Sequence, residues 1–203
     1  MNLTANGSLI LASASPRRLE LLSQAGARFS VLVPGVDETP IEGESPRAMV
    51  ERLALLKAQA VASSNPRAFV IGADTTVFID GQSLGKPSSE LEAREMLGLI
   101  QGRTHEVWGG IAVIRSGDPL SSSAEGRVER VWSHMTEVTM RQMSEDDIRD
   151  YVRTNEPMDK AGSYAIQGIG LQFVDSINGS YSNVVGLNIA SLMSCLRELG
   201  CLE

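Results

Sequence analysis

This 203-residue chain contains only two cysteines, Cys195 and Cys201, and both lie near its C-terminal end. Their spacing provides neither a CxxC redox pair nor a disulfide framework, so a reducing cytoplasm is the expected location. No apolar run approaches the roughly 20 residues of a membrane span. Residues 1–7 lack the basic and apolar regions of a signal peptide. We therefore expect a cytoplasmic protein with no membrane partner.

Positive charge is also scarce, because the formal net charge is −7. A general nucleic-acid binder is more often basic, so no nucleic-acid partner is expected. The Gly-x-Gly-x-x-Gly fingerprint and the Walker A pattern are absent, which removes support for the two common nucleotide folds. His105 and His134 have no partner at zinc spacing, and Ser13 and Ser15 lie in no nucleophile-elbow pattern. Zinc chemistry and serine hydrolysis are therefore disfavoured.

The remaining composition allows a packed core, with 42% hydrophobic and 21% charged residues. Strands alternate with helices over the first hundred residues, and a long hairpin follows. This pattern predicts an α/β fold with a mixed twisted sheet flanked by helices, in one domain over residues 1–203. The expected strands are the apolar start of 9–22 and residues 29–33, 69–79, 82–84, 104–114, 127–140 and 172–177. The expected helices begin at 16, 46, 89 and 144, with a last one over 181–199; loops are expected at 116–126 and 159–170.

The stretch 9–22 is the most unusual part of the sequence. It predicts a strand, a turn and a helix that Ser15 caps and Pro16 begins. Arg17 and Arg18 then fall in the first helical turn, where free N–H groups already carry partial positive charge. A bound anion would make this arrangement favourable. The alternative is that both arginines pair with acids elsewhere or point into water.

Two carboxylates are candidates for chemistry. Asp74 lies inside a nearly apolar strand, where a charge is costly without a partner or a metal. It is either a structural acid bonded to backbone N–H groups or a metal ligand or base. Glu38 follows a strand in a turn and alone is typical of a solvated acid. Together they could hold Mg²⁺ or Mn²⁺ with substrate phosphate oxygens.

Three further side chains are weaker candidates. Lys57 and Lys86 are, taken singly, typical of solvent-facing lysines, although Gly85 and Pro87 flank Lys86 and fix its backbone after a hairpin. Gln167 lies in the glycine-rich segment, where its amide could read a nucleobase edge or brace the loop. Cys195 is expected in the core.

Several motifs together resemble the Maf family of nucleoside triphosphate pyrophosphatases, which is linked to septum formation. The resemblance covers almost the whole chain. The matching stretches are residues 11–18 (LASASPRR), 36–38 (VDE), 52–58 (RLALLKA), 71–75 (IGADT), 84–87 (LGKP), 102–107 (GRTHEV), 159–168 (DKAGSYAIQG) and 178–187 (NGSYSNVVGL).

The resemblance implies an α/β fold similar to inosine triphosphate pyrophosphatases, with two lobes around a cleft. It implies cleavage of a nucleoside triphosphate to the monophosphate and pyrophosphate, with a divalent metal. The family's phosphate positions correspond to Ser13, Arg17, Arg18, Lys57 and Lys86. Glu38 corresponds to a metal or catalytic acid, Asp74 to the proton acceptor, and Arg17, Thr75 and Gln167 to positions linked to substrate choice.

The sequence Tyr164-Ala-Ile-Gln-Gly168 resembles the branch that acts on dTTP and UTP. The alternatives are a 7-methyl-GTP or modified-nucleotide pyrophosphatase, and a non-catalytic regulator of septum formation. A link to cell-division arrest and a homodimer are left open by the resemblance. Two residues depart from the family pattern: Asn188 replaces a proline, and Leu56 replaces a charged residue.

Overall fold

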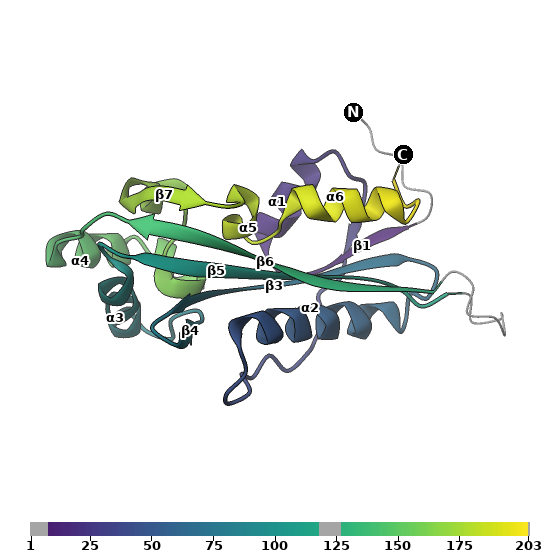
Figure 1. Cartoon of the computed structure of the whole chain (residues 1–203), viewed down its shortest axis with the longest axis horizontal. Coiled ribbons are helices and arrows are strands. Elements are labelled where there is room, and N and C mark those ends of the chain that lie inside the picture. Colours follow the sequence, from purple (N-terminus) through teal and green to yellow (C-terminus); the bar gives the residue numbers. More distant parts are fainter. Residues whose placement is uncertain (1–7, 118–126, 203) are drawn as a thin grey trace. The chain divides into compact units, whose positions relative to one another are not determined.

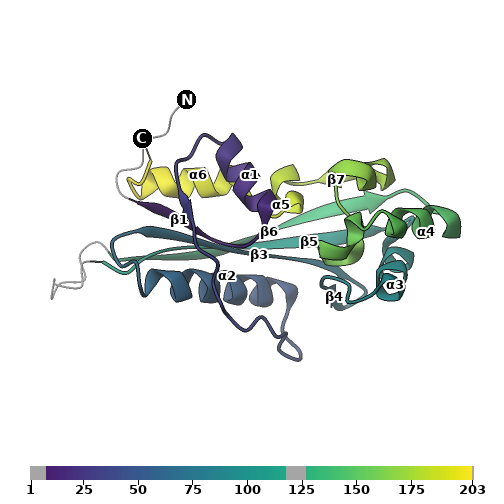
Figure 2. The same cartoon turned by 180° about the vertical axis from the view of Figure 1, so that it is seen from behind.

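The computed structural model describes residues 8–117 and 127–202 (Figures 1 and 2). Most of the expected loop at 116–126, and residues 1–7, lie outside this part. The strands are β1 (Leu9–Ala12), β2 (Ser30–Val31), β3 (Phe69–Ile79), β4 (Gln82–Leu84), β5 (Thr104–Arg115), β6 (Val128–Met140) and β7 (Val174–Asn178). The helices are α1 (Pro16–Gln24), α2 (Pro46–Ala62), α3 (Glu90–Ile100), α4 (Glu145–Arg153), α5 (Tyr181–Val185) and α6 (Ile189–Glu198), with 3₁₀ turns η1 (Glu156–Asp159), η2 (Ala161–Ser163) and η3 (Gly168–Phe173).

The strands form a seven-stranded sheet in the order β2-β1-β3-β5-β6-β7, with β4 paired to β3. Strand β1 runs parallel to both β2 and β3, whereas β4 and β7 run antiparallel to their neighbours. The expected mixed α/β sheet flanked by helices is therefore confirmed. No helix in residues 8–117 or 127–202 is both long enough and apolar enough to cross a membrane.

The chain divides into two compact units. The first unit comprises Met1–Asp74, Gly109–His134 and Gly186–Glu203, and the second comprises Thr75–Trp108 and Met135–Val185. Strands β3, β5 and β6 each contribute residues to both units. The single domain expected over residues 1–203 stays a prediction.

In the first unit, α2 covers one face of the sheet, and α1 and α6 cover the opposite face (Figures 1 and 2). The contact between α2 and the sheet is made mostly by small side chains, Ala54 and Ala58 among them. At Gly72 of β3, an added Cβ would lie only 2.1 Å from the carbonyl oxygen of Ala54. This glycine therefore lets the helix backbone approach the strand closely.

Strand β3 has the bounds that its apolar run predicts. It turns into β4 through Asp80 and Gly81, which have φ angles of 51° and 81°. Two successive positive φ angles are typical of a tight hairpin turn, and the Asp-Gly pair is the sequence signal for it. The strands expected over residues 69–79 and 82–84 are confirmed.

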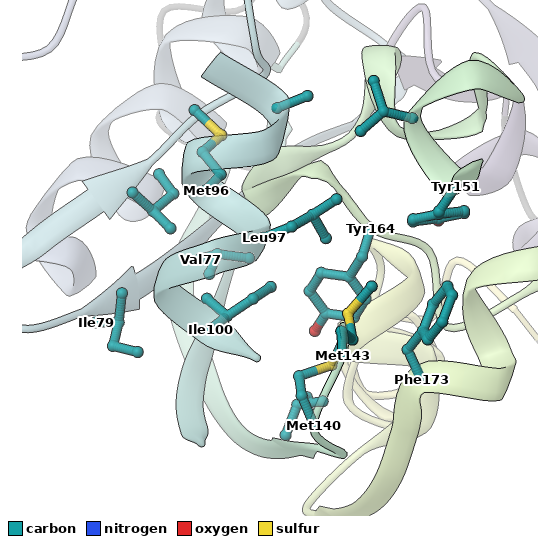
Figure 3. Close-up of a cluster of buried hydrophobic side chains, with 14 of the residues drawn as sticks. Val77, Ile79, Met96, Leu97, Ile100, Met140, Met143, Tyr151, Tyr164 and Phe173 are labelled. Carbon is teal, nitrogen blue, oxygen red and sulfur yellow. The ribbon is translucent and has the colours of Figure 1, made fainter. Parts of the chain in front are cut away.

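The second unit has a core of large, flexible and aromatic side chains (Figure 3). Met96, Leu97 and Ile100 extend from α3 into this cluster, in which Tyr164 is also buried. The ring of Tyr151 lies 5.1 Å from that of Phe173, measured between centroids. Sulfur and aromatic groups of this kind fill irregular space well.

The expected last helix over 181–199 is wrong, because the chain forms two helices there, α5 and α6. Gly186 interrupts them with a φ of 131°, which an L side chain rarely adopts. Asn188 then caps α6, since its side chain accepts a hydrogen bond from the N–H of Ser191. The departure from the family's proline thus supplies a side-chain cap.

Two helix starts also differ in detail from expectation. Ser15 is the N-cap of α1 and Pro16 begins it, but the Ser15 side chain makes no capping hydrogen bond. Ser89 caps α3 by accepting from Glu92 N–H, yet the Glu92 carboxylate accepts from Ser88 rather than from the cap residue. The reciprocal hydrogen bond that would complete a capping box between Ser89 and Glu92 therefore does not form. The edge strand at 29–33 is shorter than expected, with only Ser30–Val31 paired.

Candidate active site

A buried ion pair is the main polar feature of the first unit. The Lys57 ammonium lies 2.7 Å from an oxygen of Asp74 and 2.5 Å from an oxygen of Glu38. Lys57 and Asp74 are 6% and 8% exposed, whereas the Glu38 side chain is 53% exposed. Removing two charges from water costs several kcal/mol each unless opposite charges compensate. The arrangement therefore depends on all three groups.

Helix phase and strand alternation explain why Lys57 meets Asp74. Lys57 follows Leu53 by one helical turn and lies on the buried face of α2. Gly72 and Asp74 are two residues apart on β3, so they point to the same face, and Gly72 is the residue against α2. The interpretation of Lys57 as a solvent-facing lysine is therefore wrong, because its helix position directs it towards the sheet.

The loop that carries Glu38 is held by its neighbours. One Asp37 oxygen accepts hydrogen bonds from both the N–H and the hydroxyl of Thr39, at 2.9 and 2.6 Å, and these bonds lower the pKa of Asp37. Arg52 of α2 donates a hydrogen bond to each oxygen of Glu44, both at 2.7 Å, and a longer one to the Thr39 carbonyl at 3.5 Å. Sequence reasoning noted Arg52 only as part of a motif and assigned it no role. Its spacing from Glu44 gave no signal, because the loop conformation creates the pair.

Arg18 joins three parts of the first unit. Its Nε donates to the carbonyl of Gly186 at 2.9 Å, and its Nη1 donates to the carbonyl of Ala73 at 2.8 Å. The same Nη1 lies 3.4 Å from the hydroxyl of Ser13, which also accepts a hydrogen bond from Ser15 N–H at 3.1 Å. These contacts connect the turn after β1, the strand β3 and the segment between α5 and α6. Arg18 therefore orders the backbone around Asp74.

The charges around Arg18 are mixed. Burial lowers the pKa of its guanidinium, and Asp74 and Glu38 oppose that shift, while Arg17 adds to it. Arg17 is half-buried in the first turn of α1, which contains no acidic residue. Arg17, Arg18 and Lys57 thus outnumber the two carboxylates. A group with excess positive charge beside a helix N-terminus suits a polyanion.

The donor set can be compared with what a metal requires. Glu38 and Asp74 each use one oxygen for Lys57, and both are hard carboxylate donors. Within the described residues no group of three or more His, Cys, Asp or Glu side chains could hold a metal. The pair does fit Mg²⁺, which takes one or two carboxylates and completes its coordination with substrate oxygens and water.

The other sequence candidates belong to the second unit. Thr75 follows Asp74 on β3 and is half-buried. Lys86 is exposed, and the neighbouring Gly85 carbonyl accepts a hydrogen bond from Gly162 N–H at 3.1 Å. Gln167 is half-buried at the start of η3. The structure therefore brings together Ser13, Arg18, Glu38, Lys57 and Asp74 within the first unit.

The histidines and cysteines lie apart from this group. His105 is buried in the second unit, with Nε2 2.8 Å from the Tyr164 hydroxyl, and burial lowers its pKa to about 4. Burial also lowers the pKa of His134. Cys201 is buried, while Cys195, the cysteine expected in the core, is only half-buried. Burial raises the pKa of the Cys201 thiol to about 11, so neither geometry nor acidity makes it a nucleophile.

Fold and site together define an α/β protein with a charged group just beyond the stretch in which β1 and β3 pair in parallel, at Ser13 after β1 and at Asp74 within β3. The region beyond the carboxyl end of a parallel strand, here β1, is the usual position of a ligand site in such sheets. The family model described as Maf-like protein matches residues 8–199. The chain therefore belongs to the Maf family.

Curated relatives match along nearly the whole chain. A protein of Symbiobacterium thermophilum named dTTP/UTP pyrophosphatase is 47% identical, over 95% of this chain and 94% of its own. Proteins of the same name from Desulforamulus reducens and Bacillus cereus strain AH820 are 48% and 46% identical, over 95% and 94% of this chain and 96% and 94% of theirs. Among solved structures, the Staphylococcus aureus Ham1 protein matches with a TM-score of 0.43 at 17% identity, over 66% of this chain and 71% of that one.

Proposed function

We propose that this protein is a nucleoside triphosphate pyrophosphatase that hydrolyses dTTP and UTP to the monophosphate and pyrophosphate. The names of relatives at 46–48% identity support this activity. The observation that carries it is the buried Lys57–Asp74 pair, which continues to the exposed carboxylate of Glu38. Such a costly buried arrangement, beside excess positive charge, is typical of a site for charged substrates.

Each charged residue has a role in this proposal. Asp74 accepts the proton of a water molecule that attacks the α-phosphorus, and pyrophosphate leaves on the opposite side. Lys57 orients Asp74 and offsets charge on the phosphates. Arg17, Arg18 and Lys86 hold the triphosphate, together with the Ser13 hydroxyl and the free N–H groups of α1. Because Arg18 already binds two carbonyls, we expect it to contribute to the shape of the site as well as to its charge.

A divalent cation, Mg²⁺ or Mn²⁺, is part of the proposal. Glu38 and Asp74 would hold it through carboxylate oxygens. When bound, it supplies positive charge to the phosphate oxygens during hydrolysis.

Base selection is assigned to Arg17, Thr75 and Gln167. The Gln167 amide offers a donor and an acceptor, which complement the imide edge shared by uracil and thymine. The alternative substrate, 7-methyl-GTP or another modified nucleotide, presents a purine edge instead. The relatives' names favour the pyrimidines.

The deciding experiment is a substrate panel of dTTP, UTP, CTP, 7-methyl-GTP and ITP with product identification, with and without a chelator. We expect pyrophosphate from dTTP and UTP, dependent on metal. Asp74→Asn should lower kcat by about 10²–10⁴-fold while nucleotide binding persists. Asp175→Asn, an exposed acid on β7, is the control and should retain full activity. Orthophosphate as product, or full turnover in Asp74→Asn, would overturn the reaction or the role.

A regulator of septum formation that binds nucleotide without turnover is the rival from another class. A pure binding module has no need of a buried ion pair at the phosphate, so the site favours the enzyme. A metal-dependent release of pyrophosphate separates the two. Cytoplasmic location, the absence of a nucleic-acid partner, a homodimer and a link to cell-division arrest stay predictions.

A further inference from the structure

Glu156 makes an unusual set of hydrogen bonds in the second unit. One carboxylate oxygen accepts from Gly170 N–H and from the Tyr151 hydroxyl, both at 2.8 Å. The other oxygen accepts from Ile169 N–H at 2.9 Å. One side chain of η1 thus binds two successive backbone groups of η3. It is placed to fix the course of the segment that begins at Gln167.

Tyr151 extends this contact to the backbone that precedes Gln167. Its hydroxyl donates to Glu156 and accepts a hydrogen bond from Ala165 N–H at 3.1 Å. Both Ala165 N–H and the Tyr151 ring are buried. The Glu156–Tyr151 pair therefore holds the backbone on both sides of Gln167, at Ala165 and at Ile169 and Gly170.

The two glycines of the segment make this close approach possible. A Cβ added at Gly168 would lie 2.4 Å from an oxygen of Glu156, and φ there is +69°. A Cβ at Gly170 would lie 2.4 Å from both the Ala165 carbonyl and the Tyr151 hydroxyl. The carboxylate and the phenol therefore occupy the space that side chains at these positions would need.

The pKa shifts of Glu156 and Tyr151 agree with an ionised Glu156 carboxylate that only accepts hydrogen bonds. Burial raises the pKa of Glu156, but the hydrogen bonds from Ile169, Gly170 and Tyr151 outweigh burial and leave it below its usual value. Burial raises the pKa of Tyr151 far above its usual value, so its hydroxyl keeps its proton and donates. Three donors thus converge on one ionised acceptor.

Gln167 is the residue that this arrangement presents. Its side chain is half-buried, and in residues 8–117 and 127–202 its amide makes no hydrogen bond, including none to the 3₁₀ turn that it precedes. Holding a side chain within a fraction of an ångström requires that its own backbone be fixed by neighbours. The backbone of Gln167 is fixed by Glu156 and Tyr151.

We propose that Glu156, together with Tyr151, is a positioning residue for base selection, acting through the orientation of Gln167. This inference rests on the proposed function. The substrate class concerned is a pyrimidine nucleotide with an imide edge, as against one with an amino group in its place, such as CTP.

The test uses Glu156→Gln in the full chain. The amide keeps one acceptor oxygen and turns its NH₂ group towards Ile169 N–H, so one hydrogen bond is lost without a change of shape. We expect kcat/KM for UTP to fall about tenfold, mainly through KM, and the UTP-to-CTP ratio of kcat/KM to fall with it. In a Gln167→Ala background, Glu156→Gln should leave that ratio unchanged, because the residue through which it acts is gone.

Asp147→Asn is the matched control. The Asp147 carboxylate also accepts from a backbone N–H and a hydroxyl, both of Ser144, but it holds the start of α4. It should leave the UTP-to-CTP ratio unchanged. Equal losses for UTP and CTP in Glu156→Gln, or a further change of the ratio in the Gln167→Ala background, would overturn the positioning role.

Amide hydrogen exchange gives a readout that does not depend on turnover. In Glu156→Gln, exchange at Ile169 N–H should accelerate at least about tenfold, with α6 unchanged. Unchanged protection at Ile169 would show that Glu156 does not hold the backbone there, and it would overturn the positioning role even in an active enzyme. If the wild-type protein hydrolyses no nucleotide while this acceleration is seen, the proposed function is wrong, but the hold of Glu156 on the backbone around Gln167 is confirmed.

Discussion

The polar centres of the two units differ in the kind of interaction that holds them. In the first unit, Lys57 lies between two carboxylates, so formal charges compensate one another inside the protein. In the second unit, the single carboxylate of Glu156 is surrounded by neutral donors of the backbone and of Tyr151. A centre with several opposite charges suits phosphate chemistry, whereas a loop held by hydrogen bonds to one carboxylate suits the reading of a base.

The cores differ in the same sense. The first unit packs alanines and glycines between α2 and the sheet, which leaves its backbones in close contact. The second unit packs methionine and aromatic side chains, as Figure 3 shows. Small residues allow few alternative packings, whereas Met side chains adapt to their surroundings. We infer that the first unit tolerates substitution less well than the second.

The largest effect is expected at the ion pair. Lys57→Met leaves Asp74 buried without its nearest opposite charge and should lower the free energy of unfolding by about 3–5 kcal/mol. Urea denaturation measures this. Arg103→Met, which removes the partner of Asp80 in an exposed pair of the second unit, is the control and should change stability little. The double variant Lys57→Met/Asp74→Asn should recover part of the loss, and a purely additive loss would contradict the pairing argument.

A comparable test of backbone packing is Gly72→Ala. The new Cβ would lie 2.1 Å from the Ala54 carbonyl oxygen and 2.8 Å from Ala58 N, both backbone atoms. We expect a loss of about 3 kcal/mol, because helix and strand must separate. Gly98→Ala in α3 is the matched change in the second unit, where nothing lies within 4 Å of the added Cβ. It should stabilise by about 0.5–1 kcal/mol, and similar losses at both positions would remove the contrast between the cores.

The smallest change in the free energy of unfolding, taken per pH unit, is expected from His105 in the second unit. Its pKa of about 4 lies below the usual 6.5, so only the unfolded chain takes up a proton as pH falls below 6.5. The contribution of His105 to stability is therefore fully present above pH 6.5. As the pH falls below 6.5, the free energy of unfolding decreases by about 1.4 kcal/mol per pH unit, and the accumulated loss is about 3 kcal/mol near pH 4. In His105→Gln, the slope of the unfolding free energy against pH below 6.5 should decrease by the contribution of one proton, about 1.4 kcal/mol per pH unit. His134→Gln, at a less buried position, should change the slope less, and equal changes would contradict the burial argument.

Much of the fold could be predicted from short-range patterns. Strand β3, its Asp80-Gly81 turn and the proline starts of α1 and α2 are local properties, so an apolar run, turn residues and capping residues were enough. The break between α5 and α6 was missed, because the apolar pattern continues through it. Its cause is the conformation of Gly186, whose carbonyl is used by Arg18 from a distant part of the chain.

For the site, the sequence by itself determined which charged residues are present and that Asp74 lies in an apolar strand, where a charge needs a partner. Only the tertiary structure decided that Lys57 is this partner, that Arg18 binds carbonyls, and that Glu156 holds the segment around Gln167. The physical reason is distance along the chain. Hydrogen bonds and ion pairs act over a few ångströms, and folding, rather than spacing in the sequence, brings these groups within that range.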